Sequence, residues 1–402
     1  MMLSAPRRCF EPTIEKLFIC HIFLSYESFM KSKRITCIIS SLGGGGAERN
    51  LVRLSDWLTK MGHQVTILTL NRTIKNFYEV PSNVLHSIAP KEAHISNRWF
   101  RLHRFHPQFI ALKKCILETE PNLVISFIDI SNISVLMSLR TSKIPVIVSE
   151  RIDPREHRIR WTWSLLRRIY YPKAFQVIIV AHELLQWATT RWPRWNVSVI
   201  PNAILPPLIP LMSERPKWFS QKNVVAMGRL NKQKGFDLLL QAFARIAEQF
   251  PEWNLTIMGE GLERISLETE ILSLGLKGRV HLPGLINNPS GVLVQSDLFI
   301  LSSLYEGFPN ALAEAMACGL PVISFDCPSG PKEIIRNGID GILVPVGNMS
   351  ALSQAMQKLM ADDAGRKRLA SRAPEVLERF SQEQIIGMWQ AIIDNAVSGG
   401  NA

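Results

Sequence analysis

The chain has no long run of apolar residues. Nowhere does it contain the roughly eighteen consecutive apolar side chains that a membrane-spanning helix requires, and the apolar stretch 17–24 is short and includes His21. Residues 1–29 also lack the cleavage pattern of a secretory signal peptide. We therefore expect no transmembrane helix. We also predict that residues 1–29 are a dispensable extension, because Met30 and the basic residues after it lead directly into the first expected strand.

Cysteine is scarce and irregularly spaced. None of the six cysteines belongs to a C-x-x-C pair, so the sequence indicates neither a disulfide framework nor a cysteine-based metal site. Reduced thiols and a cytoplasmic location are the natural interpretation.

The glycine run 43–46 matches neither of two common nucleotide-binding fingerprints. Arg49 stands where G-x-G-x-x-G needs its third glycine, and no Walker-type Lys-Ser or Lys-Thr follows. The run lies between an expected strand over 34–40 and an expected helix over 48–61. We interpret Gly44, Gly45 and Gly46 as a loop that faces a cleft, close to a phosphate and an acceptor; the alternative is a flexible turn.

Buried strands alternate with helical segments along most of the chain. This pattern predicts an α/β protein with two doubly wound parallel sheets, each covered by helices on both faces. The expected strands are 34–40, 64–70, 123–128, 145–149, 176–180 and 197–200, followed by 224–227, 254–258, 280–282, 298–301, 321–324 and 341–344.

A proline-rich segment without helical periodicity, 203–217, divides the two sets of strands. The predicted parts are the extension 1–29, an N-terminal domain 30–202, the linker 203–217, a C-terminal domain 218–381 and a last helix with its tail, 382–402. Ligands of such sheets bind beyond the carboxyl ends of the strands, so the active site should lie in the cleft between the domains.

Two carboxylates, Glu306 and Glu314, are placed eight residues apart across a loop-to-helix junction. Pro309 suits a helix entry, and 311–317 is a strong helix-forming stretch that ends at Gly319. The first amides of this helix favour an anion such as a diphosphate. Glu314, about one turn into the helix, can accept hydrogen bonds from a ribose diol, whereas an amphipathic helix with a solvated Glu is the simpler alternative.

A second motif follows the strand 224–227. Gly228, Arg229, Lys234 and Gly235 form a basic, glycine-containing loop before the next helix. Its cations can neutralise a diphosphate, and its glycines allow a close approach of the backbone. A solvated charged loop is the alternative when this motif is taken alone.

Together these segments resemble glycosyltransferase family 4, a retaining, metal-independent group with the GT-B fold of two Rossmann-like domains. The resemblance covers nearly the whole chain. It also includes Ile200-Pro201-Asn202 at the domain junction and Gly330-Pro331-Lys332-Glu333-Ile334-Ile335.

The resemblance implies a role for each matching residue. Arg229 and Lys234 would bind the donor diphosphate, Glu314 the ribose, and Glu306 the donor sugar beside the reacting carbon. The catalytic set is therefore Glu306, Arg229 and Lys234. The donor-binding set is Gly228, Arg229, Lys234, Leu282, Gly284, Glu306, Phe308, Asn310, Ala311, Leu312 and Glu314, with Leu282 and Gly284 beside the base. No metal or other cofactor is expected, since Ile128-Asp129-Ile130 and Ile339-Asp340-Gly341 each offer only one aspartate where a D-x-D motif needs two.

The chain departs from the family at one place. Many members have a histidine after the fourth strand of the first domain, near the donor sugar, and here the sequence reads Ile125-Ser126-Phe127-Ile128-Asp129. Ser126, Asp129 and Glu150 are candidate replacements that would contact the sugar or the acceptor. A strand-end aspartate is equally suited to capping the next helix.

The net charge of +12 permits binding to nucleic acid, an anionic membrane or phosphorylated ligands. Arginines alternate with Trp, Tyr and Leu over 151–171, and again over 98–105, which is the composition of an interfacial helix. We therefore predict a peripheral enzyme on the inner face of the plasma membrane, using a nucleotide sugar, with UDP favoured by the resemblance, and a lipid-diphosphate-linked glycan acceptor. Packing of these aromatics inside the domain is the alternative.

Three other functions fit the sequence less well. A nucleic-acid-binding protein would use the basic segment, but no nucleic-acid module is recognisable and the carboxylate motif would have no role. A nucleotide-sugar epimerase would place its histidines and acidic residues elsewhere, and a glycogen-type phosphorylase needs a pyridoxal lysine that nothing in the sequence identifies.

Overall fold

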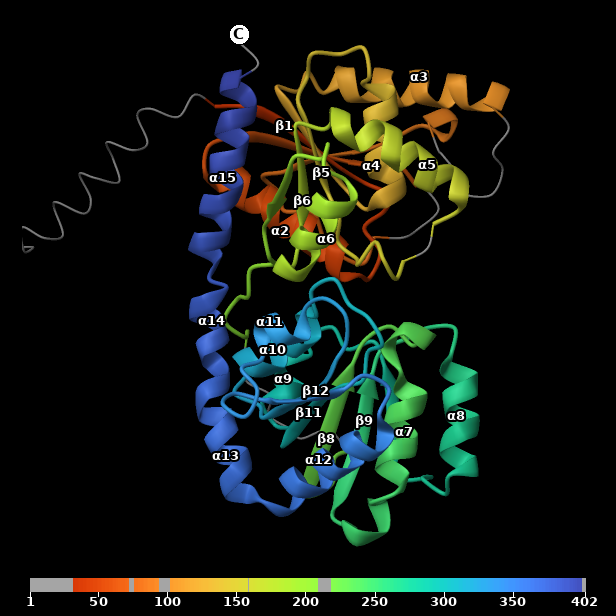
Figure 1. Ribbon diagram of the computed structural model, residues 1–402, viewed down its shortest axis with the longest axis vertical. Helices are drawn as coiled ribbons and strands as arrows, with labels where there is room; N and C mark the ends of the chain where they lie inside the picture. The colour runs from red at the N-terminus through yellow and green to blue at the C-terminus, as the bar shows by residue number, and fades with distance from the viewer. Residues whose placement is uncertain (1–31, 72–75, 94–101, 158, 209–217, 400–402) are drawn as a thin grey trace, which may run out of the picture.

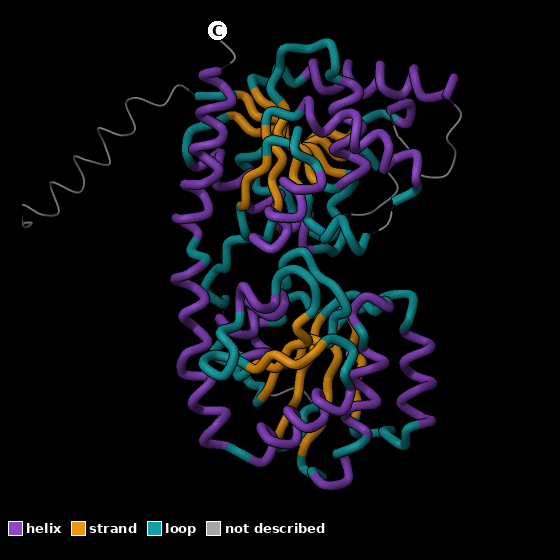
Figure 2. The backbone as a smooth tube through the Cα atoms, viewed as in Figure 1, coloured by secondary structure: helices purple, strands orange, loops and turns teal. Residues whose placement is uncertain are grey.

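The computed structural model describes residues 32–71, 76–93, 102–157, 159–208 and 218–399. Within these residues the chain folds into two halves, each built on one parallel sheet with helices packed around it (Figures 1 and 2). The described strands form a seven-stranded sheet in the order β3-β2-β1-β4-β5-β6-β7 and a six-stranded sheet in the order β10-β9-β8-β11-β12-β13. The predicted fold class is confirmed.

The first half contains the amino-terminal sheet. Its strands are β1 (Arg34–Ile39), β2 (Gln64–Thr69), β3 (Leu85–Ile88), β4 (Leu123–Phe127), β5 (Val146–Ser149), β6 (Gln176–Ile179) and β7 (Val197–Val199), and its helices are α2 (Gly46–Lys60), α3 (Leu102–Glu118), α4 (Asp129–Ser138), α5 (Trp161–Tyr170) and α6 (His182–Arg191). Alternate residues of β1 point into two different cores. Ile35, Cys37 and Ile39 pack with residues of α2, whereas Ile38 packs with residues of α3 and α4. The sheet is therefore apolar on both faces, which explains its nearly continuous hydrophobic strands.

The second half repeats this plan. Its strands are β8 (Lys222–Met227), β9 (Trp253–Met258), β10 (Val280–Gly284), β11 (Leu298–Leu301), β12 (Val322–Asp326) and β13 (Ile342–Pro345), and its helices are α7 (Phe236–Ala244), α8 (Arg264–Ser273), α9 (Ser290–Leu293), α10 (Asn310–Ala317), α11 (Pro331–Ile334) and α12 (Met349–Ala361). Val224 and Ala226 of β8 face a core shared with α7, α8 and α12, and Val225 faces the opposite core with α9 and α10.

The last three helices run along one side of both halves. These are α13 (Asp363–Arg372), α14 (Val376–Arg379) and α15 (Gln382–Ser398), drawn in blue in Figure 1. Ile385, Trp389 and Ile393 of α15 are buried in the core between α2 and the first sheet. The chain thus returns to its first half after completing the second.

The strand predictions agree with the structure to within about two residues, apart from β3, which was not predicted. The predicted extension 1–29 lies outside the described residues, as do 94–101, Arg158 and the linker positions 209–217.

Candidate active site

A cavity of about 760 Å³ lies between the two halves. It is lined by loops that follow the carboxyl ends of strands in both sheets, the place where parallel α/β sheets bind ligands. The residues predicted from the sequence that line it are Gly44, Gly45, Gly46, Asp129, Glu150, Gly228, Arg229, Lys234, Glu306, Phe308, Asn310 and Ala311. The structure therefore brings together most of the predicted site from segments far apart in the sequence.

Glu306 is fixed by two neighbours at the cavity wall. Its Oε1 atom accepts hydrogen bonds from Lys234 Nζ at 2.6 Å and from Ser303 Oγ at 2.6 Å. The aliphatic part of Lys234 lies directly over Gly228, where a Cβ atom would approach it to 3.0 Å. Gly228 thus leaves room for the lysine to reach Glu306. Ser303 is fully buried and was not identified from the sequence, because a lone serine in a loop carries no distinguishing pattern.

The start of α10 meets the first half at Asn310. Asn310 Oδ1 accepts a hydrogen bond from Asn202 Nδ2 at 3.0 Å, and Asn202 Oδ1 accepts one from Arg151 Nη1 at 2.7 Å. A Cβ atom at Gly46 would lie 2.6 Å from Asn310 Nδ2, so the starts of α2 and α10 approach each other at this point. The Asn310 amide donates to Phe308 O at 2.9 Å and is engaged within its own turn, unlike the prediction that it faces a ligand.

Glu314 is engaged by a residue that the sequence did not link to it. Arg49 Nη2 donates to Glu314 Oε1, forming an ion pair between α2 and α10 in which the two side chains are only 23% and 20% exposed. Burial alone would lower the pKa of Arg49, yet the charge of Glu314 raises it above the usual value. Arg49 lines the cavity. Its partner Glu314 lies beside the cavity but is not among the lining residues.

Three other predicted donor contacts lie outside the cavity lining. Leu312 is fully buried in the core, and Leu282 and Gly284 belong to β10, where their main-chain oxygens accept hydrogen bonds from Arg264 and from the Gly259 amide. The next two residues, Leu285 and Ile286, line the cavity instead. The segment leads to the cavity, but β10 extends two residues further than predicted.

Arg229 is exposed at the cavity and faces Glu48 at the start of α2. Burial raises the pKa of Glu48, and the positive charge of Arg229 opposes this rise. The charge of Arg229 thus acts on the half of the molecule that carries the glycine run, whereas Lys234 of the same loop pairs with Glu306.

The first half contributes a buried group of charged side chains. Glu150 accepts a hydrogen bond from the Tyr171 hydroxyl and lies 3.4 Å from Arg167 Nε, and Arg167 Nη2 donates to Asp129 Oδ2 at 3.4 Å. His157 Nε2 also lies 3.4 Å from Asp129 Oδ2. Burial raises the pKa of Glu150, although the charge of Arg167 counteracts it.

Ser126 does not join this group. It is fully buried within β4 and absent from the cavity lining, because its position in the strand turns its side chain into the core. His157 lines the cavity instead. The sequence did not indicate it, because it follows β5, whereas the family histidine follows the fourth strand.

Two family models match the chain and together span most of it. Residues 44–206 match the model described as Glycosyltransferase Family 4, and residues 213–376 match the model described as Glycosyl transferases group 1. The chain belongs to glycosyltransferase family 4. It is therefore a glycosyltransferase with the GT-B fold, as the sequence motifs predicted.

Two curated relatives of this family 4 glycosyltransferase match it over almost their whole length. A Campylobacter jejuni enzyme named GalNAc-alpha-(1->4)-GalNAc-alpha-(1->3)-diNAcBac-PP-undecaprenol alpha-1,4-N-acetyl-D-galactosaminyltransferase is 26% identical, over 90% of this chain and 98% of its own. An amylovoran biosynthesis glycosyltransferase of Erwinia amylovora is 28% identical, over 87% of this chain and 96% of its own. The solved structure of Anabaena HepE in complex with UDP has a TM-score of 0.72 and 18% identity, covering 90% of this chain and all of its own.

The α5 segment of this glycosyltransferase is only partly exposed. Trp163 and Arg167 are buried, as is Tyr171 in the turn that follows. Fewer aromatic side chains of this segment are therefore exposed than the sequence predicted. Trp161, Leu165 and Ile169, which follow one another at four-residue intervals, are 74%, 49% and 48% exposed. An apolar stripe therefore remains on the outer face of α5. None of the helices that the structure describes is long and apolar enough to cross a membrane.

Proposed function

We propose that this enzyme is a retaining, metal-independent glycosyltransferase. It transfers a hexose or N-acetylhexosamine from a UDP-sugar to a lipid-diphosphate-linked oligosaccharide during synthesis of a bacterial cell-surface polysaccharide. The observation that carries the proposal is the cavity in which Lys234 and Ser303 hold Glu306, with Arg229 and the start of α10 at the same wall.

The cations of the cavity suit a diphosphate leaving group. Arg229 and Lys234 would neutralise the charge that develops on the diphosphate as its bond to the sugar breaks, which is the electrostatic task that a divalent cation performs in other enzymes. The amides of α10 that follow Asn310 would add to this effect. In this view Glu306, held by Lys234, orients the donor sugar through its hydroxyl groups.

Retention is proposed to occur by attack from the leaving-group side. The bond from the anomeric carbon to the diphosphate oxygen breaks, and a bond to the acceptor hydroxyl oxygen forms on the same face. The acceptor proton passes to the departing diphosphate. This route needs no carboxylate nucleophile, and it gives the two cations their role in stabilising the departing anion.

The acceptor assignment is supported by the relatives and by the surface of the first half. The C. jejuni relative is named for an undecaprenol-diphosphate-linked acceptor, and the HepE structure is described with UDP. On this enzyme the stripe Trp161, Leu165 and Ile169 is accompanied by the exposed cations Arg168 and Lys173. Apolar side chains flanked by cations are typical of a helix lying on an anionic membrane, so we place the enzyme peripherally at the inner face of the plasma membrane.

A donor screen tests the proposed reaction. Purified enzyme is given UDP-, GDP- and ADP-sugars, with and without an undecaprenyl-diphosphate-linked glycan, in the presence of EDTA, and release of nucleoside diphosphate is measured. We expect release from a UDP-sugar that depends on the acceptor, persists in EDTA, and falls at least about a hundredfold in Glu306→Gln. Release from a GDP- or ADP-sugar only, or complete inhibition by EDTA, would contradict the donor or the metal assignment.

Membrane binding is tested separately by sedimentation with vesicles. We expect binding to vesicles containing anionic phospholipid and weaker binding to neutral vesicles. The variant Trp161→Ala/Leu165→Ala should reduce binding, while the control Ile265→Ala, at an exposed apolar side chain on α8 in the other half, should not. Equal binding by the wild type, the double variant and the control would contradict the proposal that this stripe binds the membrane.

A further inference from the structure

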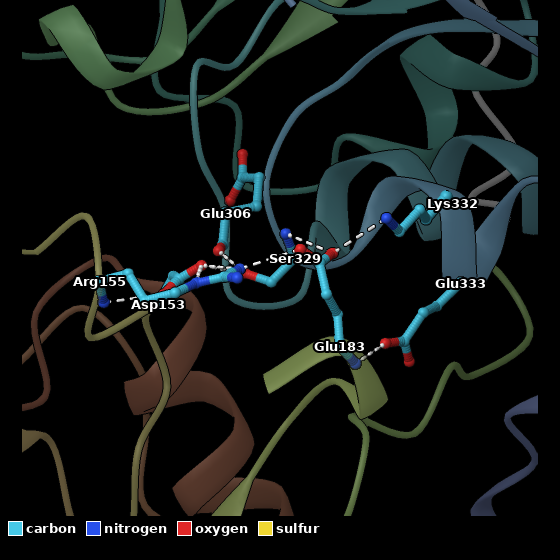
Figure 3. A network of polar contacts seen from close by, with 7 residues as sticks. All are labelled: Asp153, Arg155, Glu183, Glu306, Ser329, Lys332 and Glu333. Atoms are coloured by element: carbon cyan, nitrogen blue, oxygen red, sulfur yellow. Dashed lines mark hydrogen bonds and ion pairs between the residues drawn. The ribbon is translucent and has the colours of Figure 1, made fainter. Parts of the chain in front are cut away.

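The segment 329–333, Ser-Gly-Pro-Lys-Glu, lies where the two halves of the enzyme meet. Residues 330–335 are part of the resemblance to glycosyltransferase family 4, but the resemblance assigns them no role. The proposed chemistry does not use them either. In the structure it begins α11 and contacts two parts of the first half, the loop after β5 and the start of α6 (Figure 3).

Asp153 is the centre of this contact in the first half. It is completely buried, and its Oδ2 atom lies 2.7 Å from Arg155 Nη2 and 3.0 Å from Ser329 Oγ. Its Oδ1 atom accepts from the Arg155 amide at 2.8 Å. A buried carboxylate is costly unless it is paired and hydrogen-bonded, so this arrangement fixes the loop in one position.

Glu183, at the start of α6, connects the same arginine to the second half. Its Oε1 atom accepts from Arg155 at 3.1 Å, and its Oε2 atom accepts from the Ser329 amide at 3.2 Å and lies 3.4 Å from Lys332 Nζ. Its own amide donates to Glu333 Oε1 at 3.0 Å. Burial acts to raise the pKa of Glu183, but the hydrogen bond from Arg155 and the charge of Lys332 outweigh it and hold the pKa below its usual value.

Ser329 carries this contact to Glu306. Its hydroxyl lies 2.6 Å from the main-chain oxygen of Glu306 as well as 3.0 Å from Asp153 Oδ2, so one hydroxyl bridges the first half and the loop of the catalytic carboxylate. The Glu306 amide in turn donates to Pro328 O at 3.4 Å. Figure 3 shows the network reaching Glu306 through its main chain, while the side chain extends away from it.

Ser329 itself is held in an unusual conformation. It is fully buried and has a φ angle of +50°, in the left-handed region that non-glycine residues rarely adopt. Such a conformation persists only where the surroundings fix it, and it is most often found at functional sites. Here the surroundings are the partners from both halves.

We infer that Asp153 and Ser329 are positioning residues for the transfer reaction, and that they hold the Glu306 loop in its working position only when the two halves are in contact. Residues 329–333 thus couple closure of the cleft to placement of the carboxylate. The inference rests on the proposed function for the role of Glu306, but the contact itself can be tested without any turnover.

The test compares Ser329→Ala and Asp153→Asn with wild type and with the control Ser273→Ala. Ser273 on α8 also donates its hydroxyl to a main-chain oxygen, of Glu270, but on the exposed outer surface. Hydrogen–deuterium exchange of peptides covering 303–309 is measured first, without substrate. We expect faster exchange there in both variants, and no change in the control.

Kinetics and UDP binding provide the second measurement. We expect kcat to fall about tenfold in Ser329→Ala, while the Kd for UDP, measured by calorimetry, changes less than about twofold because the diphosphate contacts remain. The double variant Ser329→Ala/Asp153→Asn should lose little more kcat than Asp153→Asn alone, since both changes remove the same link.

A parallel loss of UDP binding, or exchange at 303–309 equal to that of the control, would overturn the inference. If the wild type transfers no sugar, the proposed function fails, and the exchange data alone decide whether the contact holds this loop.

Discussion

At the scale of single residues, both carboxylates of the E-x₇-E motif are paired with cations from distant segments. Glu306 is held by Lys234 of the same half, and Glu314 by Arg49 of the other half. The spacing of the carboxylates was visible in the sequence, because it follows from a loop-to-helix junction. The pairing with Arg49 was not, because it depends on how the two halves face each other.

The pairing of Glu314 leads to a prediction about ribose recognition. If Glu314 accepts the ribose hydroxyls, as the family resemblance implies, a ligand without the 2′-hydroxyl should lose that contact. We expect the wild type to bind UDP about tenfold more tightly than 2′-deoxy-UDP, and Glu314→Ala to bind the two equally. Calorimetric titration of both ligands measures this, with Glu268→Ala on the exposed face of α8 as control. Undiminished preference for UDP in Glu314→Ala would place the ribose elsewhere.

At the scale of elements, the sequence located every described strand except β3, an exposed strand at one edge of the first sheet. Strands such as β4 and β5 are buried throughout and appear as short apolar runs. In β3 only His86 is partly buried, and Leu85 is 69% exposed. An edge strand of this kind owes its conformation to pairing with β2, which no local pattern records.

Like the strands, the site could be predicted from the sequence where its residues belong to a local motif, and not where they are brought together by tertiary packing. The glycine run, the basic loop and Glu306 belong to compact local motifs, and each contributes residues to the cavity lining. Ser303, His157 and Arg49 are single residues whose importance arises only from tertiary packing. Leu282 and Gly284 lie within β10, just before the lining residues Leu285 and Ile286. The sequence did not show this, because the end of a strand cannot be read to within two residues from periodicity alone.

The helix α15 provides a prediction at this scale. Trp389 is 2% exposed; its ring centroid lies 6.2 Å from that of Phe127 and 5.8 Å from the Arg151 guanidinium carbon. Removing this side chain should leave a cavity between α15 and the first sheet. We expect Trp389→Ala to lower the free energy of unfolding by about 3–5 kcal/mol, as measured by urea denaturation.

The neighbouring residue provides a matched control. Met388 lies on the same helix and is 45% exposed, so Met388→Ala should change the stability by no more than about 0.5 kcal/mol. Equal effects of the two substitutions would mean that α15 is held by its connection to α14 and not by its packing on the first half.

At the scale of the whole molecule, the cleft is closed by polar side-chain contacts and by direct contact of main chains. Asn202 bridges Arg151 and Asn310, and Arg49 reaches Glu314 from the opposite side of the cleft. Burial lowers the pKa of Arg151 to about 9, and its guanidinium carbon lies 4.1 Å from the centroid of the Phe127 ring. These contacts fit two halves that meet and separate, because polar groups that pair across a cleft can also be hydrated when it opens.

One direct main-chain contact between the halves is at Gly307, and it yields a prediction about closure. A Cβ atom at this position would overlap the main-chain oxygen of Arg151 and lie 3.0 Å from the Cα atom of Ile152. Both are backbone atoms of the other half, which cannot turn aside as a flexible side chain can. Gly307→Ala should therefore prevent the halves from meeting while leaving each half folded.

We expect a larger radius of gyration by small-angle scattering than for wild type, together with a loss of transfer activity. Gly387→Ala on α15, where a Cβ atom would meet nothing within 4 Å, should scatter like wild type. If Gly307→Ala also scatters like wild type, the contact between the Glu306 loop and the first half does not control closure, and the loss of activity must come from the loop itself.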